Sequence, residues 1–396
     1  MSLSSEIIKN IKSVINFSDN SREINVHEPS FIGTNASKYI EDCLISGWVS
    51  SSGKWVTKFE ELIKEFTGSE YVIAVSNGTV ALRLALFIVG VRAGEEVIIP
   101  PLSFVATANA ISHLGAFPHF VDIDSESLGM CSKALDNRLK KIAHFKGDLV
   151  FNKYTGRRIA GVVPVHVFGI PAKIDKIKNV CNKWKIPLVE DSAEALGSKV
   201  KISNNQIHCG CVGDIGTLSF NGNKIITTGG GGALLTNNAE FAKLAKHLST
   251  TAKVHHPWEF YHDKIGWNDR LPNINAALGV SQLEQINYKI KKKRILHEKF
   301  VEIFQSFEDI EIIQELDTSI SNYWLITMRL KGVKPEKIKE SILQESHSSK
   351  IYLRPSWILL NQLPMYKDSQ KGDLSESINQ SKRLINLPSS PQLIND

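Results

Sequence analysis

The segment "SFNGNKIITTGGGG" runs from Ser219 to Gly232 and places a single lysine, Lys224, between a strand-like run and four consecutive glycines. Glycine has no Cβ, so a run of glycines lets the backbone approach another group closely. A lone lysine is usually a solvated surface residue. The chemical role of the Lys224 amine therefore depends on which residues the fold places next to it.

From about residue 70, short apolar runs alternate with segments of helical length. The strand-like runs are nearly all apolar, which is typical of strands covered on both faces. This alternation predicts an α/β fold with a mostly parallel sheet and right-handed crossovers. We expect a helix and extended arm over residues 1–30, a large α/β domain over 31–254 and a smaller α+β domain over 255–396. The predicted strands are "YVIAV", "EVIIP", "FPHFVDI", "IAGVVPVHVFG", "IPLVED", "IGTLSF" and "GGALLTN".

The charge pattern argues against a nucleic-acid or membrane protein. The net charge is +6, and its densest cluster, "KIKKKR" (Lys289–Arg294), lies in a helical pattern without interleaved aromatic residues, so we interpret it as a solvated helix face. The longest apolar run, "VALRLALFIVGV", is too short to span a bilayer and contains Arg83. The N-terminal segment carries Glu6 and no long apolar core, unlike a signal peptide.

The cysteines fit a reducing compartment, because five of them are scattered along the chain. "HCGC" (His208–Cys211) could be half of a metal site, but no second ligand pair has suitable spacing, so a loop is the better interpretation. We therefore expect a soluble cytoplasmic protein without a metal site.

Two strand ends carry residues suited to a phosphorylated ligand. "YVIAVSNGT" is a strand followed by a turn and a helix start, where Gly78, Thr79 and free backbone N–H groups could hold a phosphate. A plain N-cap and turn is the alternative there. The nucleotide fingerprints fail, because no G-x-G-x-x-G follows a strand and "GWVSSSGKW" has one residue too many for a P-loop, with Trp55 in place of Ser or Thr.

The second strand end, "IPLVEDSAEALGS", delivers Asp191. This carboxylate could cap the next helix, or it could pair with a protonated ring nitrogen and raise the pKa of that nitrogen. A phosphate-holding turn, an aspartate for a pyridinium and the lysine at position 224 together are the minimum set for pyridoxal 5'-phosphate.

With these motifs the chain resembles the DegT-type family of nucleotide-sugar aminotransferases, which depend on pyridoxal phosphate and have the aspartate-aminotransferase-like fold (fold type I). The resemblance extends from "EPSFIG" at Glu28 to "NLPSS" at Asn386. It rests on "SNGTVAL", "PPLSFVATANAI", "GAFPHFVDID", "PVHVFG", "EDSAEALGS", "GTLSFNGNKIITTGGGG" and "GWNDRLPNINAALGVSQLEQI" in that order.

The resemblance implies a role for each matching residue. Lys224 forms the Schiff base with the cofactor and transfers the proton, and Asp191 pairs with the pyridinium nitrogen. The other cofactor contacts that it implies are Phe104 stacking on the ring, Glu194 near the ring hydroxyl, Gly78, Thr79 and Ser219 on the phosphate, and Asn268 reaching the phosphate from a second subunit. The implied substrate contacts are His166, Arg270, Arg354 and Trp357. The resemblance therefore also implies a homodimer whose active sites are shared between the two subunits.

Within the family, "HEPSFIG", "DCLISGWVSSSGKWV" and "LRPSWILLNQLPMYKD" are most similar to enzymes that aminate a UDP-linked 4-keto-6-deoxy-N-acetylhexosamine. Such enzymes feed legionaminic-acid or bacillosamine-type pathways of surface glycans, with L-glutamate as amino donor. The alternatives are a GDP- or dTDP-linked keto sugar, or a sugar dehydratase of the same fold. Dehydratases of the family replace the Schiff-base lysine by histidine, whereas Lys224 is intact. A DNA-binding regulator is disfavoured because the short N-terminal helix leaves no room for a further module.

Overall fold

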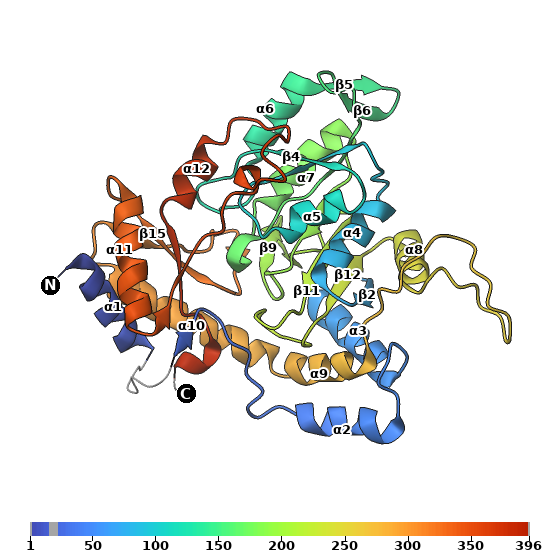
Figure 1. Cartoon of the computed structure of the whole chain (residues 1–396), viewed down its shortest axis with the longest axis horizontal. Coiled ribbons are helices and arrows are strands. Elements are labelled where there is room, and N and C mark those ends of the chain that lie inside the picture. Colours follow the sequence, from blue (N-terminus) through green and yellow to red (C-terminus); the bar gives the residue numbers. More distant parts are fainter. Residues whose placement is uncertain (1, 16–22, 395–396) are drawn as a thin grey trace.

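The computed structural model describes residues 2–15 and 23–394. A four-stranded and a three-stranded sheet, joined by a parallel bridge between Val162 and Leu188, form a continuous layer in the order β2-β12-β11-β8-β7-β3-β4 (Figure 1). Strand β12 is antiparallel to its neighbours and the other pairs are parallel, which confirms a mostly parallel sheet. The strands are β2 (Tyr71–Val75), β3 (Glu96–Ile99), β4 (Phe117–Phe120), β7 (Ile159–Val162), β8 (Val189–Asp191), β11 (Ile215–Ser219) and β12 (Gly232–Thr236).

Helices of the large part of the chain follow these strands and cover the sheet. Helix α4 begins directly after β2 because Asn77 caps it: the Asn77 side chain accepts a hydrogen bond from the backbone N–H of Val80 at 2.9 Å. Its apolar residues then pack on β11, β12 and β8. The helices in this part are α3 (Lys54–Thr67), α4 (Gly78–Ile88), α5 (Ala106–Ser112), α6 (Ser132–Ile142), α7 (Ile174–Trp184) and α8 (Ala239–Ser249).

A second, antiparallel sheet in the order β13-β15-β18-β17 forms the smaller part of the molecule. The N-terminal helix α1 packs there, so Ile7 and Ile11 share one buried cluster with Phe300, Ile326 and Ile342. The elements are α1 (Leu3–Val14), α10 (Ile286–Phe304), β13 (Ile310–Ile312), β15 (Ile326–Leu330), α11 (Pro335–Ser348), β17 (Arg354–Pro355), α12 (Ser375–Ser381) and β18 (Leu384–Leu387).

Several further elements complete the described chain. Helix α9 packs against α2 and α3 of the larger part, so packing does not change at residue 255, and the expected boundary there stays a prediction. The expected N-terminal arm is described only from residue 23 onward, where β1 pairs with β16. These elements are β1 (Ile24–Asn25), α2 (Ala36–Ser46), β5 (Ala143–Lys146), β6 (Leu149–Asn152), β9 (Lys199–Ile202), β10 (Asn205–His208), α9 (Asn273–Leu283), β14 (Ser319–Ile320) and β16 (Ile351–Tyr352).

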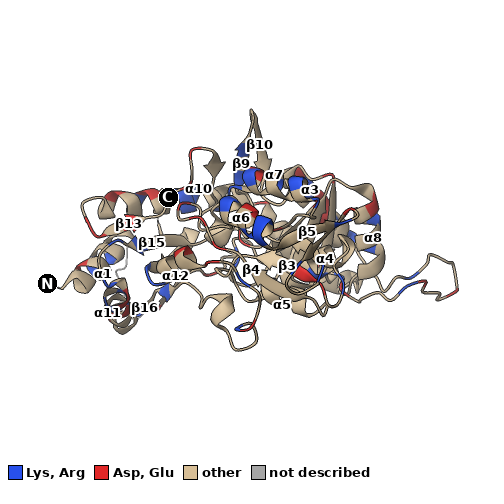
Figure 2. Cartoon of the chain, turned by 90° about the horizontal axis from the view of Figure 1, so that it is seen from above, with Lys and Arg blue, Asp and Glu red and all other residues tan. Residues whose placement is uncertain are grey.

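Lysine and arginine are distributed over many elements (Figure 2), and the interpretation of Lys289–Arg294 as a solvated face is wrong for part of that run. Lys293 is fully buried, and its Nζ donates to the backbone oxygens of Trp324, at 3.0 Å, and of Ser389. Lys289 is also buried, and burial lowers its pKa to about 8. The helix pattern did not reveal this, because the segments that bury these amines are distant in sequence. In the described part of the chain, no helix combines the length and the apolar character needed to cross a bilayer.

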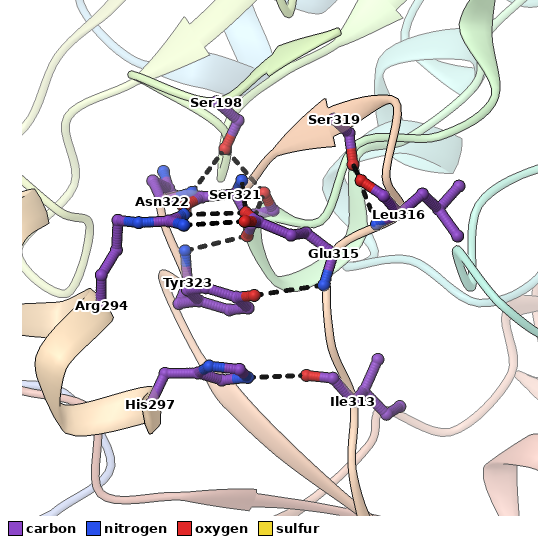
Figure 3. Close-up of polar contacts among 11 residues, drawn as sticks. Ser198, Arg294, His297, Ile313, Glu315, Leu316, Ser319, Ser321, Asn322 and Tyr323 are labelled. Atoms are coloured by element: carbon purple, nitrogen blue, oxygen red, sulfur yellow. Dashed lines mark hydrogen bonds and ion pairs between the residues drawn. The ribbon is translucent and has the colours of Figure 1, made fainter. Parts of the chain in front are cut away.

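A polar network ties the smaller part to the loop that follows β8 (Figure 3). Arg294 of α10 makes a two-pronged ion pair with Glu315, at 2.7 and 2.8 Å, and Glu315 accepts from the backbone N–H of Ser321. Asn322 then reaches the larger part, since its Nδ2 donates to the backbone oxygen of Glu194 at 2.9 Å. The network therefore fixes the segment around residue 322 against the carboxyl end of the main sheet.

Replacing Gly216 by alanine should destabilise the fold. A Cβ at this position in β11 would lie 2.0 Å from the Gly210 oxygen and 2.3 Å from its Cα, so backbone would have to move. We expect a loss of about 1–3 kcal/mol, the usual scale for overpacking, measured as a lower thermal midpoint. Gly222→Ala is the control, because nothing lies within 4 Å of its Cβ position. Equal midpoints for both variants would contradict the packing argument.

Candidate active site

A cavity of about 310 Å³ opens at the carboxyl ends of the central strands. Sequence reasoning predicted eight of the residues that line it: Gly78, Thr79, Phe104, Asp191, Glu194, Ser219, Lys224 and Trp357. These residues come from five separate stretches of the sequence, and the fold brings them together around one cavity.

Lys224 projects into this cavity from the turn after β11. The turn is closed by a hydrogen bond from the Lys224 backbone N–H to the Asn221 oxygen at 3.0 Å. The amine lies 3.4 Å from Oε1 of Glu194 and 4.0 Å from the ring centroid of Trp324, and the side chain is only 11% exposed. A lysine held in this way is sheltered from bulk water and able to act as a nucleophile or to carry a proton.

Asp191 is a buried carboxyl group without a cation directly against it. Its Oδ2 accepts a hydrogen bond from the Thr107 hydroxyl at 2.6 Å, and its Oδ1 accepts one from the backbone N–H of Ala193 at 3.2 Å. Burial raises the pKa of this carboxyl, because a charged form there is poorly solvated. A protonated ring nitrogen in the cavity would supply the missing charge, so the site fits a pyridinium.

Two glycines create the space where the start of α4 meets the main sheet. A Cβ on Gly78 would lie 2.8 Å from Cβ of Ser219, and a Cβ on Gly232 would lie 2.5 Å from the carbonyl carbon of Asn77. The close approach places the Ser219 side chain beside the first residues of an eleven-residue helix. Free N–H groups at a helix start favour an anion, so this corner of the cavity fits a phosphate.

Glu194 is also buried, and burial raises the pKa of its carboxyl. One of its oxygens accepts from the backbone N–H of Phe168 at 2.8 Å, and the other lies next to Lys224. Phe104 is 51% exposed and meets Trp357 at a ring-centroid distance of 6.2 Å. The exposed ring leaves a face available for stacking.

Four of the residues expected at the site do not line the cavity of this chain: His166, Asn268, Arg270 and Arg354. His166 is fully buried, with Nε2 3.0 Å from Glu190 and Nδ1 accepting from the backbone N–H of Ala172. Because Nδ1 accepts, a proton on Nε2 can face Glu190, so both ring nitrogens are engaged in structural hydrogen bonds, and a substrate contact of His166 stays a prediction. The sequence motif is compatible with both roles, since both place a histidine at a strand end.

Asn268 and Arg270 lie in the segment that follows the long projecting loop after α8 (Figure 1), where Arg270 donates to the Asn268 side chain at 3.2 Å. Arg354 is exposed on β17. Sequence reasoning missed other lining residues, of which Thr107 and Trp324 make the contacts described above. Thr107 could have been predicted, because it lies three residues after Phe104 in the same motif. Trp324 had no motif to signal it.

The comparisons with known proteins agree with this geometry. The model of the DegT/DnrJ/EryC1/StrS aminotransferase family matches residues 31–396. The chain belongs to this family. It is therefore a pyridoxal-phosphate-dependent aminotransferase, and its residues fit that cofactor.

Individual relatives cover nearly the whole chain. A GDP-perosamine synthase from Escherichia coli O157:H7 is 33% identical over 94% of this chain and 95% of its own length. A UDP-4-amino-4,6-dideoxy-N-acetyl-beta-L-altrosamine transaminase from Campylobacter jejuni is 28% identical over 81% of this chain and 80% of its own. The crystal structure of the aminotransferase TlmJ from Streptoalloteichus hindustanus has a TM-score of 0.83 and 26% identity, covering 95% of each chain. These matches confirm the expected fold class.

Replacing Asp191 by asparagine should change how the stability of the cofactor-free protein depends on pH. The pKa of Asp191 is raised in the folded state, so its contribution to stability is lost as pH rises above the ordinary value of 3.8 and through the raised one. Asparagine does not ionise, so we expect the thermal midpoint of Asp191→Asn to exceed that of the wild type by a few degrees at pH 8, with a smaller difference at pH 5.

With pyridoxal phosphate bound the sign should reverse, because the variant loses the partner of the pyridinium. Thermal scans with and without the cofactor measure both effects. The exposed Asp317→Asn variant is the control and should show neither. A pH-independent difference in the cofactor-free protein would contradict the assignment of a raised pKa to Asp191.

Proposed function

We propose that this enzyme transfers the amino group of L-glutamate to the C4 ketone of a nucleotide-linked 4-keto-6-deoxy sugar. The observation that carries the proposal is the convergence of Lys224, Asp191 and the helix start at Gly78 on one cavity in a chain of this family. The names of the relatives support a nucleotide-sugar substrate, since one is a GDP-perosamine synthase and another a UDP-amino-sugar transaminase. The intact lysine supports amination over dehydration.

Pyridoxal phosphate, when bound, supplies an electron sink for the carbon that loses or gains a proton. The amine of Lys224 carries that proton at Nζ between the reacting carbon and the cofactor, acting as general acid and base. Asp191, oriented by the Thr107 hydroxyl at 2.6 Å, keeps a proton on the ring nitrogen. Phe104 and Trp324 cover the reacting groups and exclude water from them.

The remaining proposed contacts involve the phosphate, the ring hydroxyl and the substrate side of the cavity. We propose that Gly78, Thr79 and Ser219 hold the phosphate at the start of α4, with the Ser219 side chain beside Gly78. The Glu194 carboxyl, next to Lys224, faces the ring hydroxyl. Trp357 borders the part of the cavity open to substrate.

We propose a homodimer in which the partner subunit completes each site. In a single chain Asn268 and Arg270 do not line the cavity. They follow a projecting loop that exposes large apolar side chains, which a second copy would cover. These side chains are Trp258, Phe260, Tyr261 and Ile265.

For the nucleotide we propose two candidates, in order. Motif resemblance favours a UDP-linked 2-acetamido-2,6-dideoxy-hexos-4-ulose, whose aminated product belongs to legionaminic-acid or bacillosamine-type chemistry. The second candidate is a GDP-linked keto sugar, favoured by the 33% identity to a GDP-perosamine synthase over 94% of this chain. The base does not alter the roles given to Lys224 and Asp191.

Shared sites predict complementation between two inactive variants. Lys224→Ala removes the proton carrier and should lower kcat by about 10³-fold or more, the upper scale of positioned proton transfer. Asn268→Ala should weaken cofactor binding. Co-expressed at equal levels, the two should recover about a quarter of wild-type activity, since half the dimers are mixed and each mixed dimer has one intact site. No recovery in isolated mixed dimers would show that Asn268 acts within its own chain.

Substrate class is tested by half-reactions on the loaded enzyme. L-Glutamate should remove the absorbance of the lysine-bound cofactor, and the correct keto sugar should restore it. We expect kcat/KM for the UDP-linked 4-keto-6-deoxy-N-acetylhexosamine to exceed that for the GDP-linked keto sugar by about tenfold or more, the discrimination that matched polar contacts give. The reverse order would establish the second candidate, and no recovery with either would overturn a 4-keto-6-deoxy substrate.

A further inference from the structure

A second cavity, of about 530 Å³, lies beyond the edge strand β4 and shares no lining residue with the cavity of Lys224. Its walls are helix α6 and the segment 371–373 that precedes α12, which lies beside α6 and β4 in Figure 1. The segment is held on the sheet edge by two hydrogen bonds. The Phe120 N–H donates to the Gln370 oxygen, and the Gly372 N–H donates to the Phe120 oxygen, both at 2.8 Å.

Three cations line this cavity: Arg138, Lys141 and Lys371. Within residues 2–15 and 23–394, none of them forms an ion pair with a carboxylate. Burial lowers the pKa of Arg138 because its charge is partly desolvated, and the Glu96 carboxylate, on the far side of His119, offsets only part of this effect. Lys141 and Lys371 are exposed at the rim.

The direction of the Arg138 guanidinium is fixed by a buried chain of hydrogen bonds. Its Nε donates to Nε2 of His119 at 2.9 Å, and Nδ1 of His119 lies 2.9 Å from Glu96. His119 and Glu96 are fully buried, and burial lowers the pKa of His119, so the ring is neutral with its proton on Nδ1. With Nε anchored in this way, the two terminal nitrogens of Arg138 remain available for an anion.

The two carboxylates of the cavity are engaged by the first residues of α12. Asp122 accepts from the backbone N–H groups of Ser377, at 2.8 Å, and Glu376, at 2.9 Å. Asp373 accepts from the N–H and hydroxyl of Ser375 at 3.2 and 3.0 Å. Both carboxylates are therefore held by donors of α12, and within the described residues neither forms an ion pair with the three cations that line the cavity.

We propose that this cavity binds a small molecule carrying a diphosphate, with Arg138 gripping one phosphate and Lys141 and Lys371 the other. A planar guanidinium matches phosphate oxygens in a two-pronged manner, and a cavity of about 300–1,000 Å³ suits a ligand of nucleotide size. The ligand would bridge α6 and the segment leading to α12. Inorganic pyrophosphate, a free nucleoside diphosphate and a nucleotide-sugar share this chemistry.

The test titrates inorganic pyrophosphate into the cofactor-loaded enzyme by calorimetry, with amide exchange followed over residues 371–377. In the wild type we expect binding and slower exchange there. Arg138→Met should weaken binding by about tenfold or more and remove the protection, as loss of a two-pronged charged contact implies. If Arg138→Met lowers the thermal midpoint, Lys371→Met, at an exposed position, tests the loss of pyrophosphate binding independently. Lys140→Met is the control, since Lys140 pairs with Asp136 at 2.7 Å.

Transamination rates should be equal in all these variants, which separates this cavity from any diphosphate contact in the catalytic one. UDP and GDP distinguish the sources: tighter binding than pyrophosphate by about tenfold or more would indicate a nucleotide, and equal binding a diphosphate alone. Either result supports the proposal if the measured affinity falls in the Arg138→Met and Lys371→Met variants. Unchanged affinity in both variants, or protection elsewhere without protection of residues 371–377, would overturn it.

Discussion

The buried carboxylate of Glu190 is the interaction on which the catalytic edge of the sheet depends. It accepts hydrogen bonds from His166 and from the backbone N–H groups of Gly210, Val212 and Gly213, at 3.0, 2.9, 2.7 and 2.5 Å. Burial alone would raise its pKa, but the hydrogen bond from His166 and those from the backbone lower it below the ordinary value. Glu190 therefore stays ionised and clamps the loop before β11 to the end of β8.

This clamp explains why two adjacent carboxyl groups behave differently. Glu190 is met by four donors, whereas Asp191, next along β8, is met by two donors and has its pKa raised by burial. Successive side chains of a strand point to opposite faces, so one carboxylate stabilises the loop and the other faces the cavity. The pairing of β11 with β8 then carries the chain to Ser219 and on to the turn that holds Lys224.

Much of this could be predicted because its causes are local in sequence. Apolar runs define buried strands, and Gly78, Asp191 and Lys224 each sit directly after one, so a parallel sheet brings them to one edge. Trp324 and the buried amine of Lys293 could not be predicted, because the smaller part of the chain covers them from far away in sequence. His166 had a signal that fitted two roles, and its hydrogen bond from the backbone N–H of Ala172, which comes from a loop, had no signal in the motif.

The two cavities have opposite charge requirements. In one, the buried carboxyl of Asp191 has no cation directly against it, and a pyridinium would supply that charge. In the other, a hydrogen bond to His119, which is itself bonded to Glu96, orients the guanidinium of Arg138 and leaves its two terminal nitrogens available to a ligand. A neutral imidazole is suited to this task, because it aligns the arginine through Nε while keeping the Glu96 carboxylate out of direct contact with the guanidinium. In both cavities an ionisable group is thus fixed by hydrogen bonds without a counter-ion in direct contact, which indicates a cationic ligand at one place and an anionic ligand at the other.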